Sequence, residues 1–422
     1  MRLKTHTSFR SLSLMMSLVL CFGVSFRPQA AHAVEAVDNV MDRIDDFMQN
    51  GPIARLKSQA ARKYGLIVSP YFKTGWELTS NTFKSPNPER QDVLWTFAPG
   101  VNITHRGDYG EVGLNYEAQF RYFTRHGKQN EQDNGFSVYG DFYPVERLNV
   151  KVSESLQQQG STAGARGVEP LDSFDNTVTA SVIYEVTDQV DNELGYRNFM
   201  REYDGKNFDT FSYMENEYFD EVFYQLNENH RLYTGYHLGL VDYDKTNSRN
   251  AYYHVFPVGS QGNLPYGIEY KAEMAAYVRN QQADDRNDFF MLIGSVDLKK
   301  QLTERTAIGA GFLRRPVEST FAGTEVFDEK TFYGNLTHRL SQKVRARMDI
   351  STSGRDFDSR ATVGAVTVKR KDQVFSFGLG MDYAVRRWLV VNADYRVERR
   401  NSNLSPFDYT DNRFVLGATV PI

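Results

Sequence analysis

Cysteine is nearly absent from this chain of 422 residues, because the single one, Cys21, lies close to the N-terminus. A fold held together by disulfides is therefore excluded. Proline is also scarce, with 13 residues, whereas 25 tyrosines and 29 phenylalanines bring the aromatic content to 14%. Few prolines and many aromatic residues are typical of β-rich chains.

A long apolar run is also missing after residue 33, so no later segment is long enough for a transmembrane helix. The one apolar stretch, Ser11–Phe26, is short for a membrane span and follows three basic residues. Ala31 and Ala33 then form a small–x–small cleavage site. We predict a cleaved secretory signal peptide over residues 1–33, with a membrane-anchoring helix as the less favoured alternative.

Positive charge is in deficit once this segment is removed. The signal peptide contains four basic residues, which leaves 45 Lys and Arg against 53 Asp and Glu, a net charge near −8. This balance argues against nucleic acid as a partner. The mean hydropathy of −0.53 is that of a soluble protein, but a transmembrane β-barrel also fits, since half of each strand faces a wet lumen.

Residues 34–64 are predicted to form a helical leader. Val37, Val40, Ile44 and Phe47 recur at three- and four-residue spacing, which indicates one apolar stripe along a helix. We expect a periplasmic segment packed under the rest of the chain. A plug in a lumen and a docking helix for a periplasmic partner remain open alternatives.

From Leu66 onward, apolar and polar residues alternate in segment after segment. Gly110–Thr124 is the clearest of them, with apolar residues at even positions and polar residues at odd positions. The final segment alternates likewise from Phe414 to Ile422. If this last strand pairs with the first, no strand edge stays exposed. An apolar outer face and a charged inner face are typical of a transmembrane β-barrel.

The segments number about 18, and 16 remain possible because Ala251–Arg279 and Ser353–Lys371 are difficult to assign. Short turns alternate with longer polar loops, as periplasmic turns alternate with extracellular loops in outer-membrane barrels. We therefore predict an all-β fold: an antiparallel up-and-down barrel over residues 65–422 in the outer membrane of a Gram-negative bacterium, with both termini in the periplasm.

A barrel of 16–18 strands leaves an aqueous channel. Polar and charged residues on the predicted inner face are candidate pore-lining residues: Glu111, Asn115, Glu117, Gln119, Arg121, His237, Arg345, Arg347, Asp349, Asp394, Arg396 and Glu398. One interpretation is that charges of both signs form ladders that stiffen the wall. The other is that Arg345 and Arg347 bind carboxylates of an acidic polymer, as basic rings do in anion pores.

No catalytic pattern is present. A Gly-x-Ser-x-Gly elbow is missing, as is the His-x-Ser-Asn-Gly-like stretch of outer-membrane phospholipases. No metal-ligand spacing appears either. We predict no enzymatic activity, no catalytic residue, no metal and no cofactor.

Several segments resemble one known family, the outer-membrane β-barrel porins encoded with exopolysaccharide and capsule synthesis and export genes. The resemblance covers roughly Leu66 to Ile422 and rests on Phe97–Val101, Tyr116-Glu117, Arg121-Tyr122, Glu215-Asn216, Val222–Leu226, Tyr233–Tyr236, Arg399–Asn403, Asp408–Arg413 and Leu416-Gly417.

This resemblance implies an exit channel for an exopolysaccharide, with a place in biofilm formation. The implied partners are the polysaccharide itself and the inner-membrane and periplasmic proteins that make and export it. Outer-membrane lipid, lipopolysaccharide and the barrel-assembly machinery are expected to contact the barrel. The alternative is an uptake porin, general or substrate-specific, for small solutes or oligosaccharides; a hydrolase and an adhesive barrel are less favoured.

Overall fold

The computed structural model describes residues 65–86, 90–160, 172–204, 208–283, 288–319, 326–363 and 366–422. The predicted signal peptide (1–33) and the predicted helical leader (34–64) lie outside these residues. Almost all of the described chain is antiparallel β-structure.

The structure contains 18 strands and four short 3₁₀ helices. The strands are β1 (Leu66–Thr79), β2 (Asp92–Gly107), β3 (Gly110–Phe123), β4 (Glu131–Val145), β5 (Leu148–Gln159), β6 (Ser173–Thr187), β7 (Val190–Tyr203), β8 (Tyr213–Asn227), β9 (His230–Tyr243), β10 (Ala251–Leu264), β11 (Ile268–Gln281), β12 (Phe289–Thr303), β13 (Thr306–Glu318), β14 (Val326–Arg339), β15 (Val344–Val363), β16 (Val366–Arg386), β17 (Leu389–Ser402) and β18 (Tyr409–Pro421). The 3₁₀ helices are η1 (Gly127–Gln129), η2 (Asp209–Phe211), η3 (Asn247–Arg249) and η4 (Ser405–Phe407).

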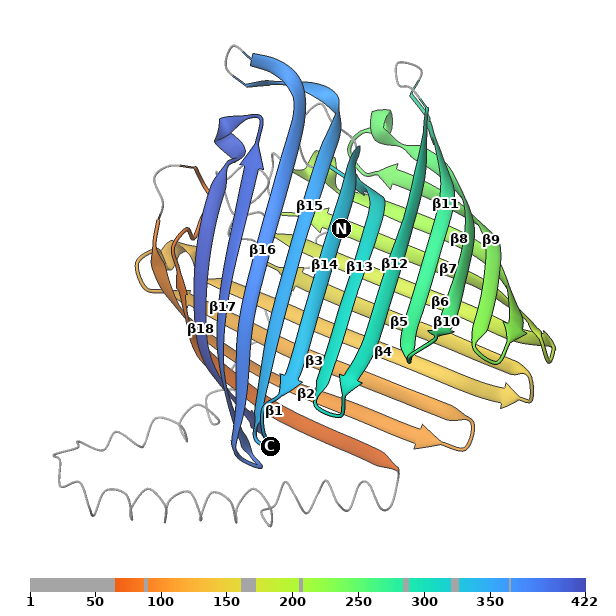
Figure 1. Ribbon diagram of the computed structural model, residues 1–422. Coiled ribbons are helices and arrows are strands. Elements are labelled where there is room, and N and C mark those ends of the chain that lie inside the picture. Colours follow the sequence, from red (N-terminus) through yellow and green to blue (C-terminus); the bar gives the residue numbers. More distant parts are fainter. Residues whose placement is uncertain are drawn as a thin grey trace, which may run out of the picture. The chain divides into compact units, whose positions relative to one another are not determined.

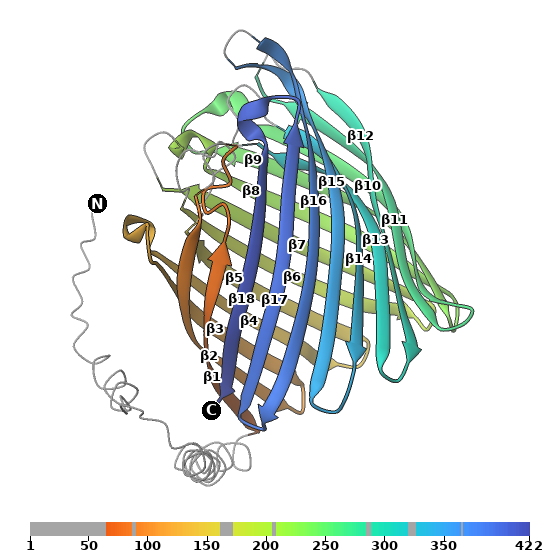
Figure 2. The same cartoon turned by 60° about the vertical axis from the view of Figure 1, so that its left-hand side comes forward.

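Each strand pairs with its sequence neighbours, and β1 also pairs with β18, so the sheet closes into a barrel (Figure 1). Figure 2 shows β1 and β18 side by side at this closure. The predicted up-and-down barrel is confirmed, and the count is 18 rather than 16. Closure leaves no exposed sheet edge along this seam, which removes a pairing hazard.

The two rims of the barrel differ. Short turns such as Asp108-Tyr109 and Glu146-Arg147 connect strands at one rim, which we call the turn end. Longer connections, among them 124–130 and 403–408, and all four 3₁₀ helices lie at the other rim, the loop end. In outer-membrane barrels short turns face the periplasm and long loops face the outside.

The outer face is apolar over most of its height. Trp76 and Trp95 are directly paired across β1 and β2, with ring centroids 5.3 Å apart, and each is about half exposed. Phe256, Leu292 and Phe332 are similarly exposed on β10, β12 and β14. Exposed apolar residues on alternate positions form the surface that lipid covers in such barrels. Within the described residues, no helix is long and apolar enough to span a membrane.

The two segments that were difficult to assign from the sequence are mostly strand. Within Ala251–Arg279, β10 continues to Leu264 and the chain turns only at Pro265–Gly267, where Tyr266 and Gly267 have positive φ. Gly259 acts there as a packing position: it lies directly opposite Tyr233, whose ring occupies the space of the missing side chain. In the other uncertain segment, Ser353–Val363 belongs to β15 and Val366–Lys371 belongs to β16.

Candidate functional site: the barrel lumen

The strand register assigns one face of every strand to the lumen. All twelve predicted pore-lining residues share this inner face: Glu111, Asn115, Glu117, Gln119 and Arg121 on β3, His237 on β9, Arg345, Arg347 and Asp349 on β15, and Asp394, Arg396 and Glu398 on β17. The sequence pattern did not show which of them meet. Most contact partners that lie one or two strands away.

Tyrosines that lie over glycines are the repeating unit of this inner wall. Tyr71 lies directly opposite Gly100, Tyr253 opposite Gly239 and Tyr333 opposite Gly311, and each ring fills the space above its glycine. Aromatic side chains that cover strand glycines compensate for the packing the glycine lacks.

The hydroxyl of each of these tyrosines then donates to a carboxylate farther along the wall. Tyr71 donates to Glu117 (2.7 Å) and Tyr333 donates to Asp297, while the Tyr253 hydroxyl lies within hydrogen-bond distance of both Glu215 (2.7 Å) and Glu217 (2.6 Å). These tyrosines were missed as inner-wall residues because a Tyr suits the lipid boundary as well as the lumen. A glycine at the paired position of a neighbouring strand is the signal that distinguishes a lumenal tyrosine from one at the lipid boundary.

Most charges of the inner wall are paired. Arg345 contacts Asp382 (2.8 Å), and Arg347 contacts both Asp382 (3.0 Å) and Asp394 (2.9 Å). On β3, the Arg121 guanidinium lies 2.7 Å from carboxylate oxygens of both Glu131 and Asp133. These contacts fit the interpretation of wall ladders. Asp382 was not among the predicted pore-lining residues.

Four more of the predicted residues have an ionisable side chain as their partner. Lys73 contacts Glu117 (2.6 Å), Arg106 contacts Glu111, Glu221 contacts His237 (3.0 Å), and Lys84 contacts Glu398 (2.7 Å). Asn115 donates to Ser137 (3.1 Å). Within the described residues, no group of three or more His, Cys, Asp or Glu side chains is arranged to hold a metal ion.

A hairpin folds into the lumen at the loop end. The pairing of β12 with β13 stops at Gly294 and Arg314, although β12 starts five residues earlier and β13 continues to Glu318 (Figure 1). Beyond this point β13 pairs only with β14. On the other side, Phe327–Glu329 of β14 remain paired with Arg355–Phe357 of β15. We call Arg315–Ser319 together with Val326–Glu329 the inner hairpin.

Contacts of Glu318 place the inner hairpin over the inner wall of β9–β11. Its carboxylate accepts a hydrogen bond from Tyr243 of β9 (2.5 Å) and pairs with Arg279 of β11, whose side chain is only 2% exposed. Arg249 donates to the carbonyl oxygen of Ser319 (2.9 Å). Underneath lies a buried cluster: Tyr213, Val241, Tyr243, Tyr253, Val255, Ala275 and Tyr277. The hairpin therefore narrows the lumen at the loop end.

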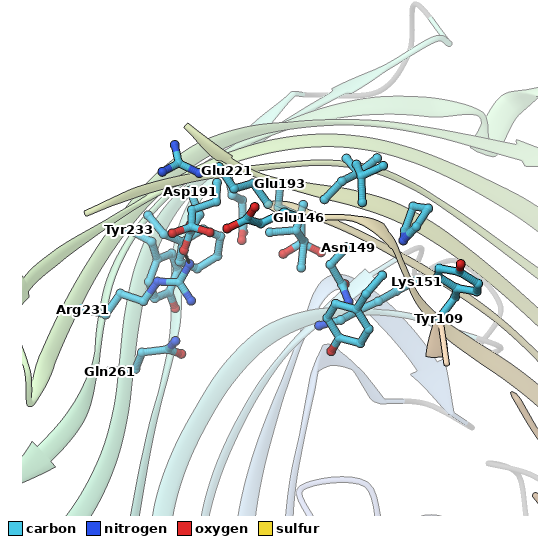
Figure 3. Close-up of a pocket in the computed structure, with 18 of the residues that line it drawn as sticks. Tyr109, Glu146, Asn149, Lys151, Asp191, Glu193, Glu221, Arg231, Tyr233 and Gln261 are labelled. Atoms are coloured by element: carbon cyan, nitrogen blue, oxygen red, sulfur yellow. Dashed lines mark hydrogen bonds and ion pairs between the residues drawn. The ribbon is translucent and has the colours of Figure 1, made fainter. Parts of the chain in front are cut away.

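A cavity of about 830 Å³ occupies the turn end of the lumen (Figure 3). Glu193 lies directly opposite Glu221, and Glu185 directly opposite Asp191, so four carboxylates adjoin on β6–β8. Among the described residues, the side chains of Glu185, Glu193 and Lys151 in this cavity make no ion pair or hydrogen bond, whereas Asp191 pairs with Arg231. Like charges on paired strands repel each other.

A second, smaller cavity of about 400 Å³ lies on the wall formed by β15–β18 and β1. Its backbone floor includes Gly378 and Gly380 of β16, so we call it the glycine-floored pocket. Six charged side chains surround the floor: Glu77, Arg347, Asp349, Asp394, Arg396 and Arg413. Four of them belong to the predicted pore-lining set, whereas Glu77 and Arg413 had been assigned no role.

Comparison with known proteins gives a family match over nearly the whole barrel. Residues 63–421 match the family described as "Putative beta-barrel porin 2". Similar solved structures include OpdK of Pseudomonas aeruginosa with vanillate, at 11% identity over 84% of this chain and 99% of that chain, with a TM-score of 0.46. OccK2 (OpdF) of the same organism in complex with glucuronate has 9% identity over 84% and 98%, with a TM-score of 0.47.

OccAB3 of Acinetobacter baumannii has 11% identity over 85% of this chain and 99% of that chain, with a TM-score of 0.46. A comparison with curated proteins found no match. The closed 18-strand sheet has an apolar outer face and a charged inner face, the structure that a porin requires. The family match confirms the resemblance inferred from the sequence: the chain belongs to the Putative beta-barrel porin 2 family and is an outer-membrane β-barrel porin of Gram-negative type.

Proposed function

We propose that this porin is a passive channel for small hydrophilic solutes. The observation that supports it best is the inner hairpin, which occupies part of the loop end and is held there by Glu318, Arg279 and Tyr243. An 18-strand barrel without such an element leaves a wide aqueous lumen. A hairpin fixed inside the lumen favours the passage of small solutes over that of a long polymer.

The polar lining fits the same solutes. Arginines, carboxylates and tyrosine hydroxyls line the wall from β14 to β18, and their pairing keeps them in fixed positions. Fixed donors and acceptors can exchange hydrogen bonds with a passing solute at little reorganisation cost. Export of an exopolysaccharide, which the family resemblance implied, has no comparable support from these residues, and the polysaccharide-export partners, the lipid contacts and the assembly machinery stay predictions.

Liposome swelling with solutes of graded size tests the proposal. The full-length protein is reconstituted, and swelling rates are compared for arabinose, glucose, sucrose and raffinose. We expect the rate to fall steeply with solute size. Rates that stay equal across this series would contradict a narrow channel and would favour the export reading.

The same assay tests whether the inner hairpin sets the size limit. Glu318→Gln removes the ion pair with Arg279, and we expect larger sugars to enter faster in this variant. Asp242→Asn is a matched control, because it also removes a negative charge near the loop end, but Asp242 lies on the outer face of β9, where it contacts Asn250. An unchanged size dependence in Glu318→Gln would show that another element limits the pore.

A further inference from the structure

Two opposite charges flank one glycine in the glycine-floored pocket. Asp349 of β15 and Arg396 of β17 are the paired neighbours of Gly378 on its two sides. A Cβ atom placed on Gly378 would lie 3.8 Å from Asp349 Oδ2 and 3.9 Å from Arg396 Nε. Both charged groups therefore approach one point above the glycine, where no side chain is present.

Asp349 and Arg396 differ from the other charges of this pocket. Among the described residues, neither of these two side chains makes an ion pair or a hydrogen bond. Arg347 pairs with Asp382 and Asp394, and Arg413 contacts Asp411 (2.6 Å) and Glu77 (3.6 Å). The wall is thus held together without Asp349 and Arg396, whose charges remain available to a solute.

The charges of the pocket cancel: Glu77, Asp349 and Asp394 oppose Arg347, Arg396 and Arg413. An anion would gain at Arg396 but be repelled at Asp349, and a cation would meet the reverse. A molecule that has an ammonium group and a carboxylate satisfies both free charges at once. The volume of about 400 Å³ falls within the range of roughly 300–1,000 Å³ that is usual for small-molecule sites.

We propose that the glycine-floored pocket binds a small zwitterion of the size of a free amino acid. Its ammonium group lies against Asp349, its carboxylate lies against Arg396, and its carbon chain rests above Gly378. A guanidinium suits the carboxylate because its planar N–H groups can donate two parallel hydrogen bonds. The assignment rests on the proposed function, since the solute must enter the lumen.

Equilibrium dialysis of the full-length protein in detergent micelles tests the site directly, with labelled L-alanine as the probe. Acetate, methylammonium and glycerol serve as unlabelled competitors that present one charge, the other charge, or none. We expect unlabelled alanine to displace the probe. Acetate and methylammonium, which each lack one ion pair, should be about two- to fivefold less effective, and glycerol, which lacks both, less effective still.

Gly378→Val should abolish alanine binding, because its side chain fills the space between the two charges. Gly354→Val is the matched control: it places the same substitution on the neighbouring β15 at a glycine with nothing within 4 Å of its added Cβ. Valine suits a strand, so both variants are compatible with barrel folding. Retained alanine binding in a folded Gly378→Val would overturn the proposal.

Charge variants provide a test that does not depend on that substitution. Asp349→Asn and Arg396→Gln should each weaken alanine binding about two- to fivefold, as expected for one partly solvated ion pair. The exchange of both, Asp349→Arg with Arg396→Asp, should restore binding with the zwitterion reversed. A failure of this exchange to restore binding, or equal displacement by acetate or glycerol, would contradict a zwitterion site.

The zwitterion site and the small-solute channel can each be contradicted without the other. Dialysis reports binding without transport, whereas swelling reports transport without binding. Sugar-driven swelling without alanine binding would leave the small-solute channel standing and remove the zwitterion site. Alanine binding with no swelling by any sugar would contradict the channel instead.

Discussion

The two ends of the lumen are built in different ways. At the loop end, inner side chains are buried: Val241 is 1% exposed, Tyr253 is 5% exposed, and Arg279 is covered by the inner hairpin. At the turn end, a cavity of about 830 Å³ leaves Glu185, Glu193 and Lys151 without protein partners. This difference indicates that the two ends have separate roles: the loop end limits the size of a solute, and the turn end favours or disfavours a solute by its charge.

This separation of roles follows from the residues that face inward. The loop-end parts of β8–β11 bring tyrosines and valine together, and such side chains lower the free energy when they leave water. The turn-end parts of β6–β8 bring carboxylates together, and these stay hydrated in a wide cavity. A packed layer can hold a hairpin in the lumen, whereas a hydrated layer leaves the lumen open.

The largest expected effect comes from disrupting the packed layer itself. In Gly239→Val the new side chain would collide with the Tyr253 ring, and the hydrogen bonds of Tyr253 to Glu215 and Glu217 would break. Overpacking costs about 1–3 kcal/mol, and each lost hydrogen bond to a charged group costs about 1.5–3 kcal/mol. The urea midpoint of unfolding should fall strongly, while Gly354→Val should leave it near the wild-type value.

Releasing the inner hairpin should have the next largest effect. Glu318→Ala leaves the buried Arg279 without its carboxylate, and breaking a buried pair by removing one partner costs about 3–5 kcal/mol. We expect the inner hairpin to lose its contact with the inner wall of β9–β11 and the single-channel conductance to rise. An unchanged conductance would mean that the hairpin stays in place without its ion pair, held by Arg249 and the apolar cluster.

The sequence was sufficient for the architecture because barrel strands repeat one physical rule. Alternation along Gly110–Thr124 and along the last hairpin predicts which side of each strand meets lipid. The same rule placed all twelve candidate residues on the inner face, including Arg345 and Asp394. Alternation failed at Gly259, where glycine is used for packing, since glycine also signals a turn.

The site was less predictable, because it depends on contacts between strands far apart in the chain. Nothing in the local sequence around Glu318 indicates that it leaves the barrel wall and meets Arg279 and Tyr243. The free pair Asp349 and Arg396 is recognisable only once Gly378 is known to lie between them. Register and hairpin placement are therefore the two properties that sequence reasoning lacked.

A smaller effect is expected from the paired arginines on the wall beside the glycine-floored pocket. Arg345→Ala with Arg347→Ala removes two lumenal cations and leaves Asp382 and Asp394 uncompensated. Anion selectivity should fall, measured as a shift of the reversal potential in a salt gradient. Adding Asp382→Asn and Asp394→Asn should return the potential towards the wild-type value, because the net lumenal charge is then restored. An unshifted potential in the first variant would contradict a lumenal role.

The smallest effect should come from the turn end. Glu185→Gln with Glu193→Gln removes two unpaired carboxylates, so the permeability of cations relative to that of anions should decrease by roughly twofold. The shift should be smaller than that of the arginine variant, because this cavity is about twice as large and mobile ions screen its charges better. The shift should also become smaller as the salt concentration is raised, since exposed charges are screened within about 10 Å at 0.1 M.

Asp242→Asn, on the outer face of β9, is the matched control for the loss of a charge. If the size limit measured by swelling changes in the glutamine variant, the two ends do not have separate roles, because charge at the turn end would then also affect the size limit.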